Sequence, residues 1–84
     1  MGEIVEGDIQ TNLQKVGSGG VTDATTAGNY LKAFIDKAKA EGIDVADLGI
    51  EGLTNDTDVT KLSLETIKSM SNQVLDISAN SAYY

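Results

Sequence analysis

The chain has 84 residues and a formal net charge of −7 at pH 7, so it has room for one small acidic domain. It contains no cysteine and no histidine, which excludes disulfide bonds and leaves a zinc or copper site without its usual ligands. The acidic balance also argues against binding to phosphate backbones or to anionic membrane surfaces.

The N-terminal part of the chain, residues 1–20, is predicted to be a flexible polar arm that contains one short helix. Asp8 can cap this helix, and apolar residues follow it with helical spacing on one face. The sequence GSGG at 17–20 then interrupts the pattern, because glycine marks a hinge or a loop. The apolar residues of the short helix are Ile9, Leu13 and Val16.

A second, amphipathic helix is predicted over residues 22–41. Thr22 or Asp23 can act as its N-cap, and Gly42 is well placed to end it. Its apolar residues recur at intervals of three and four, with lysines and an aspartate between them. We expect this apolar stripe to pack against another helix, with its aromatic rings in the core. The expected helix-packing residues are Tyr30, Leu31, Phe34 and Ile35.

Residues 42–57 are predicted to form an acidic, glycine-containing loop. Its apolar residues are isolated, which indicates a loop held against the helices, with one helical turn at 44–48 or a short strand as alternatives. A calcium loop of the EF-hand type is rejected, because Val59 stands where that loop requires glycine. The acids without a neighbouring base in and just after this loop are Asp44, Asp47, Glu51, Asp56 and Asp58.

The last predicted helix is long and runs over residues 58–82, with Thr57 or Asp58 as its cap. Its apolar residues step by three and four, a period of 3.5 that is typical of helices packed along their lengths. A helix of about 23 residues would extend roughly 35 Å, which we expect to be too long for the rest of the chain to cover. We therefore predict self-assembly through this seam. The self-assembly residues are Leu64, Ile67, Met70, Val74, Ile77, Tyr83 and Tyr84.

Together these elements predict an all-α fold, a helical hairpin-like subunit with a long C-terminal amphipathic helix and no sheet. The missing residue types argue against catalysis, since no side chain here titrates near neutral pH in its ordinary state. A serine or threonine nucleophile would need a lysine or carboxylate base with a strongly shifted pKa. We therefore predict that the protein is not an enzyme and uses no cofactor or metal.

Two stretches, TNLQKVGSGG (11–20) and KLSLETIKSMSNQVLDISANSAYY (61–84), give the chain a resemblance to a known family. It resembles the needle and pilus subunits of bacterial type III secretion systems, including the Hrp-type pilins. The chain departs from the animal-type needle proteins in lacking their short proline-containing turn between helices. The resemblance implies a structural subunit that polymerises into a secreted, hollow filament, a conduit for protein export.

The same resemblance implies partners and a location. The partners would be copies of the chain, an export chaperone and the secretion apparatus, with no nucleic acid and no membrane insertion. The N-terminal sequence MGEIVEGDIQ lacks the basic and apolar regions of a cleavable Sec signal. We therefore expect a cytoplasmic protein that is exported, without a cleaved signal, to an extracellular surface filament.

Other interpretations remain open at this point. Residues 46–53, ADLGIEGL, resemble the motif of acyl carrier proteins, but Gly52 stands where the cofactor-bearing serine belongs. Such a chain would be a degenerate carrier. A small acidic inhibitor or nucleic-acid mimic is the second alternative, and a small helical protein with another role is the third.

Overall fold

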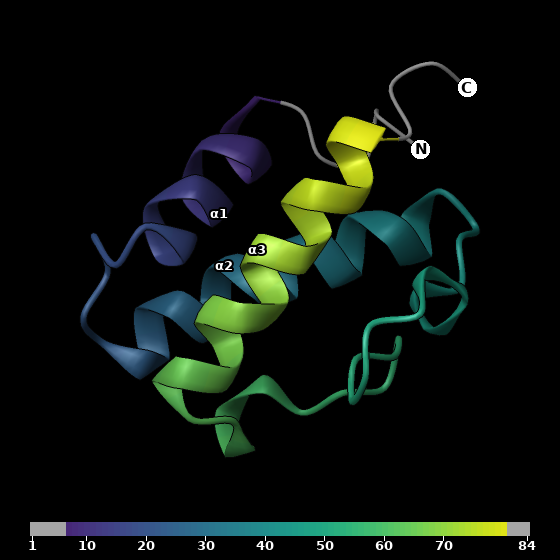
Figure 1. Ribbon diagram of the computed structural model, residues 1–84. Helices are drawn as coiled ribbons and strands as arrows, with labels where there is room; N and C mark the ends of the chain where they lie inside the picture. Colours follow the sequence, from purple (N-terminus) through teal and green to yellow (C-terminus); the bar gives the residue numbers. More distant parts are fainter. Residues whose placement is uncertain (1–6, 81–84) are drawn as a thin grey trace.

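A computed structural model describes residues 7–80 of the chain and shows that it is all-α (Figure 1), which confirms the predicted fold class. The described residues contain no β-strand. Tyr83, Tyr84 and the first six residues of the predicted polar arm lie outside the described range. The elements in chain order are α1 (Asp8–Gly17), α2 (Ala24–Ala40), the short 3-10 helices η2 (Val45–Leu48) and η3 (Val59–Lys61), and α3 (Leu64–Asn80).

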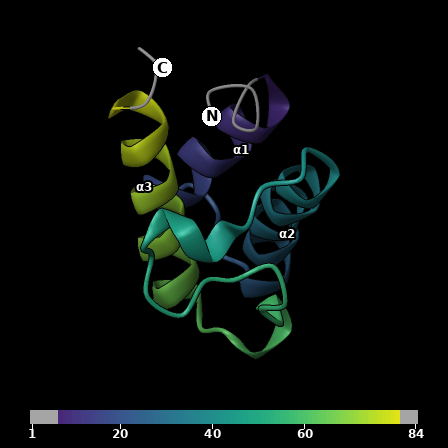
Figure 2. The ribbon, with the colours of Figure 1, turned by 90° about the vertical axis from the view of Figure 1, so that its right-hand side faces the viewer.

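The three α-helices form a small bundle whose outline is visible from two sides (Figures 1 and 2). Helices α1 and α2 run in opposite directions and form a helical hairpin. The segment 41–63 then carries the chain back along the bundle, so that α3 runs in the same general direction as α2. Helix α3 packs against both members of the hairpin.

Local sequence signals determine both ends of α2. The Asp23 carboxylate accepts hydrogen bonds from the Thr26 backbone N–H at 3.0 Å and from its hydroxyl at 2.8 Å, which caps the first turn. At the other end Gly42 has a φ of 73°, a left-handed conformation that glycine adopts without strain. The Ile43 N–H then donates to the Ala38 carbonyl at 2.9 Å, as in a Schellman motif.

Helix α3 begins at Leu64, six residues later than the start of the predicted range 58–82, which corrects that start; residues 81 and 82, at the predicted end, lie outside the described range. Asp58 does cap a helix, but it caps η3 by accepting from the Thr60 N–H. Leu62 is then extended, with ψ of 144°. A second cap follows immediately, because the Ser63 hydroxyl accepts from the Thr66 N–H at 3.1 Å. Two good caps five residues apart therefore divide the predicted helix into a 3-10 turn and α3.

The core is a single apolar cluster to which the three helices and the segment 41–63 all contribute. The 17 residues of α3 extend about 25 Å, within the 33 Å longest dimension of the molecule. The described part of α3 is thus short enough for the rest of the chain to cover. The buried apolar residues are Leu13, Val16, Ala27, Leu31, Phe34, Ile35, Ala38, Val45, Ile50, Leu53, Val59, Ile67, Met70 and Val74.

Candidate functional site

The central residues of the predicted self-assembly seam lie in the core of their own chain. Ile67, Met70 and Val74 are 0%, 3% and 1% exposed. Leu64 and Ile77 are partly buried at the edge of the same cluster. The middle of the seam is therefore covered by the rest of this chain, whereas Tyr83 and Tyr84, at its predicted end, lie outside the described residues.

The predicted helix-packing residues of α2 also lie together. Leu31, Phe34 and Ile35 are fully or nearly fully buried, and Phe34 is the largest of the completely buried side chains. Tyr30 is partly buried and packs against the same cluster. These side chains fill the space between the helices, so they are part of the core of the molecule.

A residue that the sequence pattern did not single out, Ser71, is fully buried on α3. Its hydroxyl has no hydrogen-bond partner in the described part of the chain. Burial of an unsatisfied hydroxyl opposes folding by about 1–3 kcal/mol. The signal was present in the sequence, because Ser71 lies four residues after Ile67 and three before Val74 and so shares their helical face.

The carboxylates with shifted pKa values act as helix caps. Hydrogen bonds from the Thr26 hydroxyl and backbone hold the pKa of Asp23 below its ordinary value. Those from Thr60 lower the pKa of Asp58 in the same way. Both carboxylates are fully exposed, and no group of three or more potential metal ligands occurs among residues 7–80. Their arrangement supplies neither an acid–base pair nor an ion site.

The acidic segment, defined as residues 42–58, is held in place by neutral groups. The Asn55 side chain accepts from the Val45 N–H at 2.9 Å and donates to the Ile43 carbonyl at 3.1 Å. The Thr57 hydroxyl accepts from the Thr54 N–H at 2.7 Å. The five acids of the segment are all exposed. The segment is therefore a structured surface that presents negative charge to solvent.

The carrier-like stretch has a geometry that does not suit an attached group. Gly52 has a φ of 81°, so a residue with a side chain would be strained there. A Cβ at this position would also meet the Met70 methyl carbon at 3.3 Å. Serine in place of Gly52 would therefore disturb the loop and the core below it.

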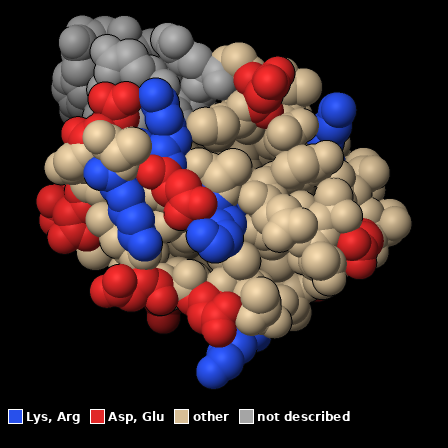
Figure 3. Space-filling view, turned by 180° about the vertical axis from the view of Figure 1, so that it is seen from behind, with Lys and Arg blue, Asp and Glu red and all other residues tan. Residues whose placement is uncertain are grey.

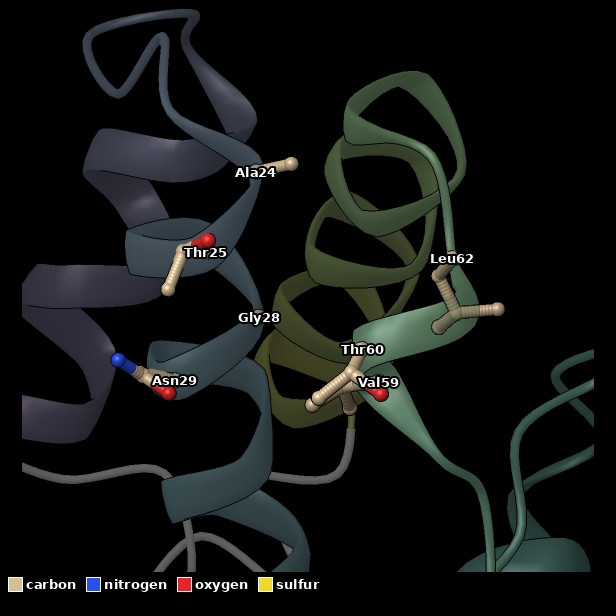
Figure 4. A pocket seen from close by; sticks show the side chains of 7 residues that line it. All are labelled: Ala24, Thr25, Gly28, Asn29, Val59, Thr60 and Leu62. Carbon is tan, nitrogen blue, oxygen red and sulfur yellow. The ribbon is translucent and has the colours of Figure 1, made fainter.

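A small hollow lies between the first turns of α2 and η3 (Figure 4). Its volume is about 100 Å³, well below the roughly 300–1,000 Å³ of ordinary small-molecule pockets. On α2, Gly28 allows close approach, since a Cβ there would lie 3.5 Å from a Val59 methyl carbon. The hollow is large enough for one small side chain. Its lining residues are Ala24, Thr25, Gly28, Asn29, Val59, Thr60 and Leu62.

This hollow lies beside a surface that we call the neutral side, the exposed part of residues 9–31. Lys15 and Asp23 are the only charged residues in that range, so its net charge is zero. The range corresponds to α1, the glycine-containing linker and the start of α2. Seen from behind, charged side chains gather over one half of the view, while the half that holds these elements is mostly uncharged (Figure 3). The net charge of −7 therefore belongs to the rest of the chain.

Comparison with known protein families, curated proteins and solved structures finds no match to this chain. Within residues 7–80, no helix is both long and apolar enough to cross a lipid bilayer. The described surface of the molecule has two distinct regions that a partner could contact, the acidic segment and the neutral side.

Proposed function

We propose that the protein is a non-catalytic structural subunit that binds copies of itself. In its most specific form, the proposal is that these copies build the secreted, type III needle- or pilus-like filament that the sequence resemblance implies. The neutral side is the observation that carries this proposal. Because the net charge of −7 lies outside residues 9–31, two copies meet least electrostatic repulsion when they approach through this side.

The composition of the neutral side suits close contact between proteins. Its exposed residues are mostly small or uncharged, and small side chains lose little rotamer entropy when they are buried. The hollow beside Thr25 and Asn29 adds a depression that a small side chain of a neighbour can fill. Repulsion between the acidic segments acts over about 10 Å at 0.1 M salt, so it is weakest when those segments face away from each other.

Sedimentation velocity over a range of protein concentrations tests this proposal. The double variant Gln14→Glu/Asn29→Asp changes two exposed residues of the neutral side to nearly isosteric acids. We expect it to weaken self-association by about tenfold or more, since like charges would then face each other across the contact. Higher salt should strengthen the association of the parent protein by screening its residual repulsion.

The matched control is Ser69→Asp/Gln73→Glu, which adds the same charge to exposed positions of α3. This control should associate much like the parent, apart from a small uniform effect of net charge. Negative-stain microscopy of the concentrated parent then examines the filament form. A parent protein that stays monomeric at millimolar concentration in high salt contradicts the proposal.

A further inference from the structure

We propose that α1 is exchanged between copies, so that the α1 of one copy packs onto the α3 of a second copy. This inference rests on the self-association proposed above and adds a second link between the copies. The docking site is the side of α3 that α1 covers, and the occupant is the segment 8–17 of another copy of this chain. The linked copies then form either a closed dimer or a longer chain.

One side of α3 already receives a helix of this protein. Helix α1 lies beside α3 in both ribbon views and packs against it more extensively than against α2 (Figures 1 and 2). Leu13 and Val16, the inward residues of α1, are completely buried. The side of α3 that α1 covers is thus complementary to this helix, whichever copy supplies it.

Few directional interactions hold α1 to its own chain. The Asn72 side-chain amide donates to the Gly17 carbonyl at 3.2 Å, and this bond would form equally well between two copies. The ion pairs Lys32–Asp36 and Lys37–Glu41 join residues of α2 and its C-cap and do not involve α1. At the start of α1, Gly7 provides no side-chain cap. Apolar packing therefore supplies most of the attachment, and packing does not distinguish one copy from another.

The linker after α1 is suited to open. It turns back through local bonds, such as that from the Gly20 N–H to the Lys15 carbonyl at 2.8 Å, and Gly19 has a φ of 87°. Glycine also populates extended conformations readily, so the same residues can straighten. Residues 18–23 would then span roughly 20 Å, enough to carry α1 across to a neighbouring copy.

Ser71 makes the buried face of α3 easier to open. It lies between Ile67 and Val74 on that face, and its hydroxyl has no hydrogen-bond partner in the described structure. Hydration of this hydroxyl on opening therefore breaks no hydrogen bond.

An exchanged α1 makes the same contacts as before, and only the linker changes shape. Domain swapping needs no newly evolved surface for this reason. Mutual exchange between two copies closes a dimer. Exchange in one direction, each copy donating to the next, continues as an open chain, which is the arrangement that a filament requires.

A pair of engineered cysteines tests the exchange directly, because the chain has none of its own. A Cβ at Gly17 would lie 3.0 Å from the Asn72 side-chain carbon Cγ, so cysteines at these two positions can form a disulfide. The full-length variant Gly17→Cys/Asn72→Cys is concentrated under reducing conditions, oxidised, and analysed on a denaturing gel without reductant. We expect covalent dimers and larger species, increasing with protein concentration.

The control pair is Gly17→Cys/Ser69→Cys, since Ser69 is exposed on α3 and this pair measures random collision. Monomers with internal disulfides at every concentration overturn the exchange. If the same sample also sediments as an oligomer, the self-association proposal survives alone. If it sediments as a monomer, both proposals fail.

A linker variant gives a second, independent measurement. Gly19→Ala strains the left-handed turn that returns α1 to its own chain, and it should raise the association constant about five- to tenfold. Gly42→Ala, at φ of 73° in open space after α2, carries a similar strain outside the linker. It should leave the association constant unchanged. Equal effects of the two variants, or none from Gly19→Ala, overturn the inference.

Discussion

The neutral side and the acidic segment are both on the surface, but they are built in different ways. The neutral side is formed by α1, the linker and the first part of α2, and residues 9–31 carry one positive and one negative charge. The acidic segment is mostly irregular and carries five acids without a base. Val45, Ile50 and Leu53 attach it to the common core. The difference teaches that this chain concentrates negative charge on an irregular segment that backbone bonds and buried anchors hold, and leaves residues 9–31 without net charge.

The largest expected effect comes from the core that both regions share. Phe34→Ala removes the largest completely buried side chain and should lower the free energy of unfolding by about 3–5 kcal/mol. A domain this small has only a few kcal/mol in total, so we expect most of the helical circular dichroism signal to be lost. Both regions should unfold together, because both are anchored in the same cluster.

Ala33→Ser, at the adjacent exposed position, is the control for this experiment. It should change the stability by less than about 0.5 kcal/mol. A Phe34→Ala protein that melts near the parent temperature would show that the two regions do not depend on one core.

A medium effect should separate the two regions through a matched pair of asparagines. Asn55→Ala removes both hydrogen bonds of the Asn55 side chain and leaves the Val45 N–H and the Ile43 carbonyl unpaired, which should lower the free energy of unfolding by about 1–3 kcal/mol. Asn29→Ala on the neutral side removes no hydrogen bond seen in the described structure and should change stability by less than about 0.5 kcal/mol. Urea unfolding measures both. Amide hydrogen exchange should be faster across residues 42–58 in the Asn55 variant alone. Equal stability and equal exchange in the two variants would contradict the role of Asn55 in holding the acidic segment.

The smallest effect concerns the two aspartate caps, one in each region. The folded-state pKa values of Asp23 and Asp58 are lowered from 3.8 by bonds to Thr26 and Thr60. A lowered folded-state pKa means that each cap stabilises the fold above about pH 3.8, and that this stabilisation is lost as the pH falls through the folded-state value. Thermal melts of the parent should therefore show a decline in this acidic range.

Asn in place of either aspartate keeps the capping oxygen and removes the titration. Asp23→Asn and Asp58→Asn should each flatten the acid decline slightly. At neutral pH Asp58→Asn should be the better tolerated, since it also removes one charge from the acidic segment. Melts of both variants that follow the parent at every pH would show that the caps contribute nothing to the acid response.

The helix ends show how far local sequence determines this fold. The end of α2 at Gly42 and its cap at Asp23 could be read from residue types, because these act within a few residues. The start of α3 could not. Asp58 and Ser63 are both good caps. Which of them begins α3 depends on the extended backbone of Leu62 and on the packing of Val59 against Gly28, a residue 31 positions earlier in the chain.

The seam shows a different limit. The spacing of Ile67, Met70 and Val74 predicts a buried helical face but does not name the helix that covers it. Here α3 packs against both α1 and α2, whose apolar stripes were also visible in the sequence, and Met70 lies against the loop at Gly52. Which stripes meet depends on how the linker and the segment 41–63 fold. The helical spacing of Ser71 with Ile67 and Val74 shows from the sequence that this serine is on the buried face. The hollow beside Gly28 could not be predicted, because it depends on how closely η3 approaches α2.

The close approach of α2 to η3 has a consequence for how sequences with this fold can vary. A methyl group at Gly28 would meet Val59 at ordinary contact distance, but anything larger would push the two segments apart. Position 28 should therefore accept only glycine or alanine wherever valine is kept at position 59. A larger residue at one position should appear together with a smaller one at the other. Sequences that share this fold should therefore show correlated replacement at these two positions, which lie 31 residues apart in the chain.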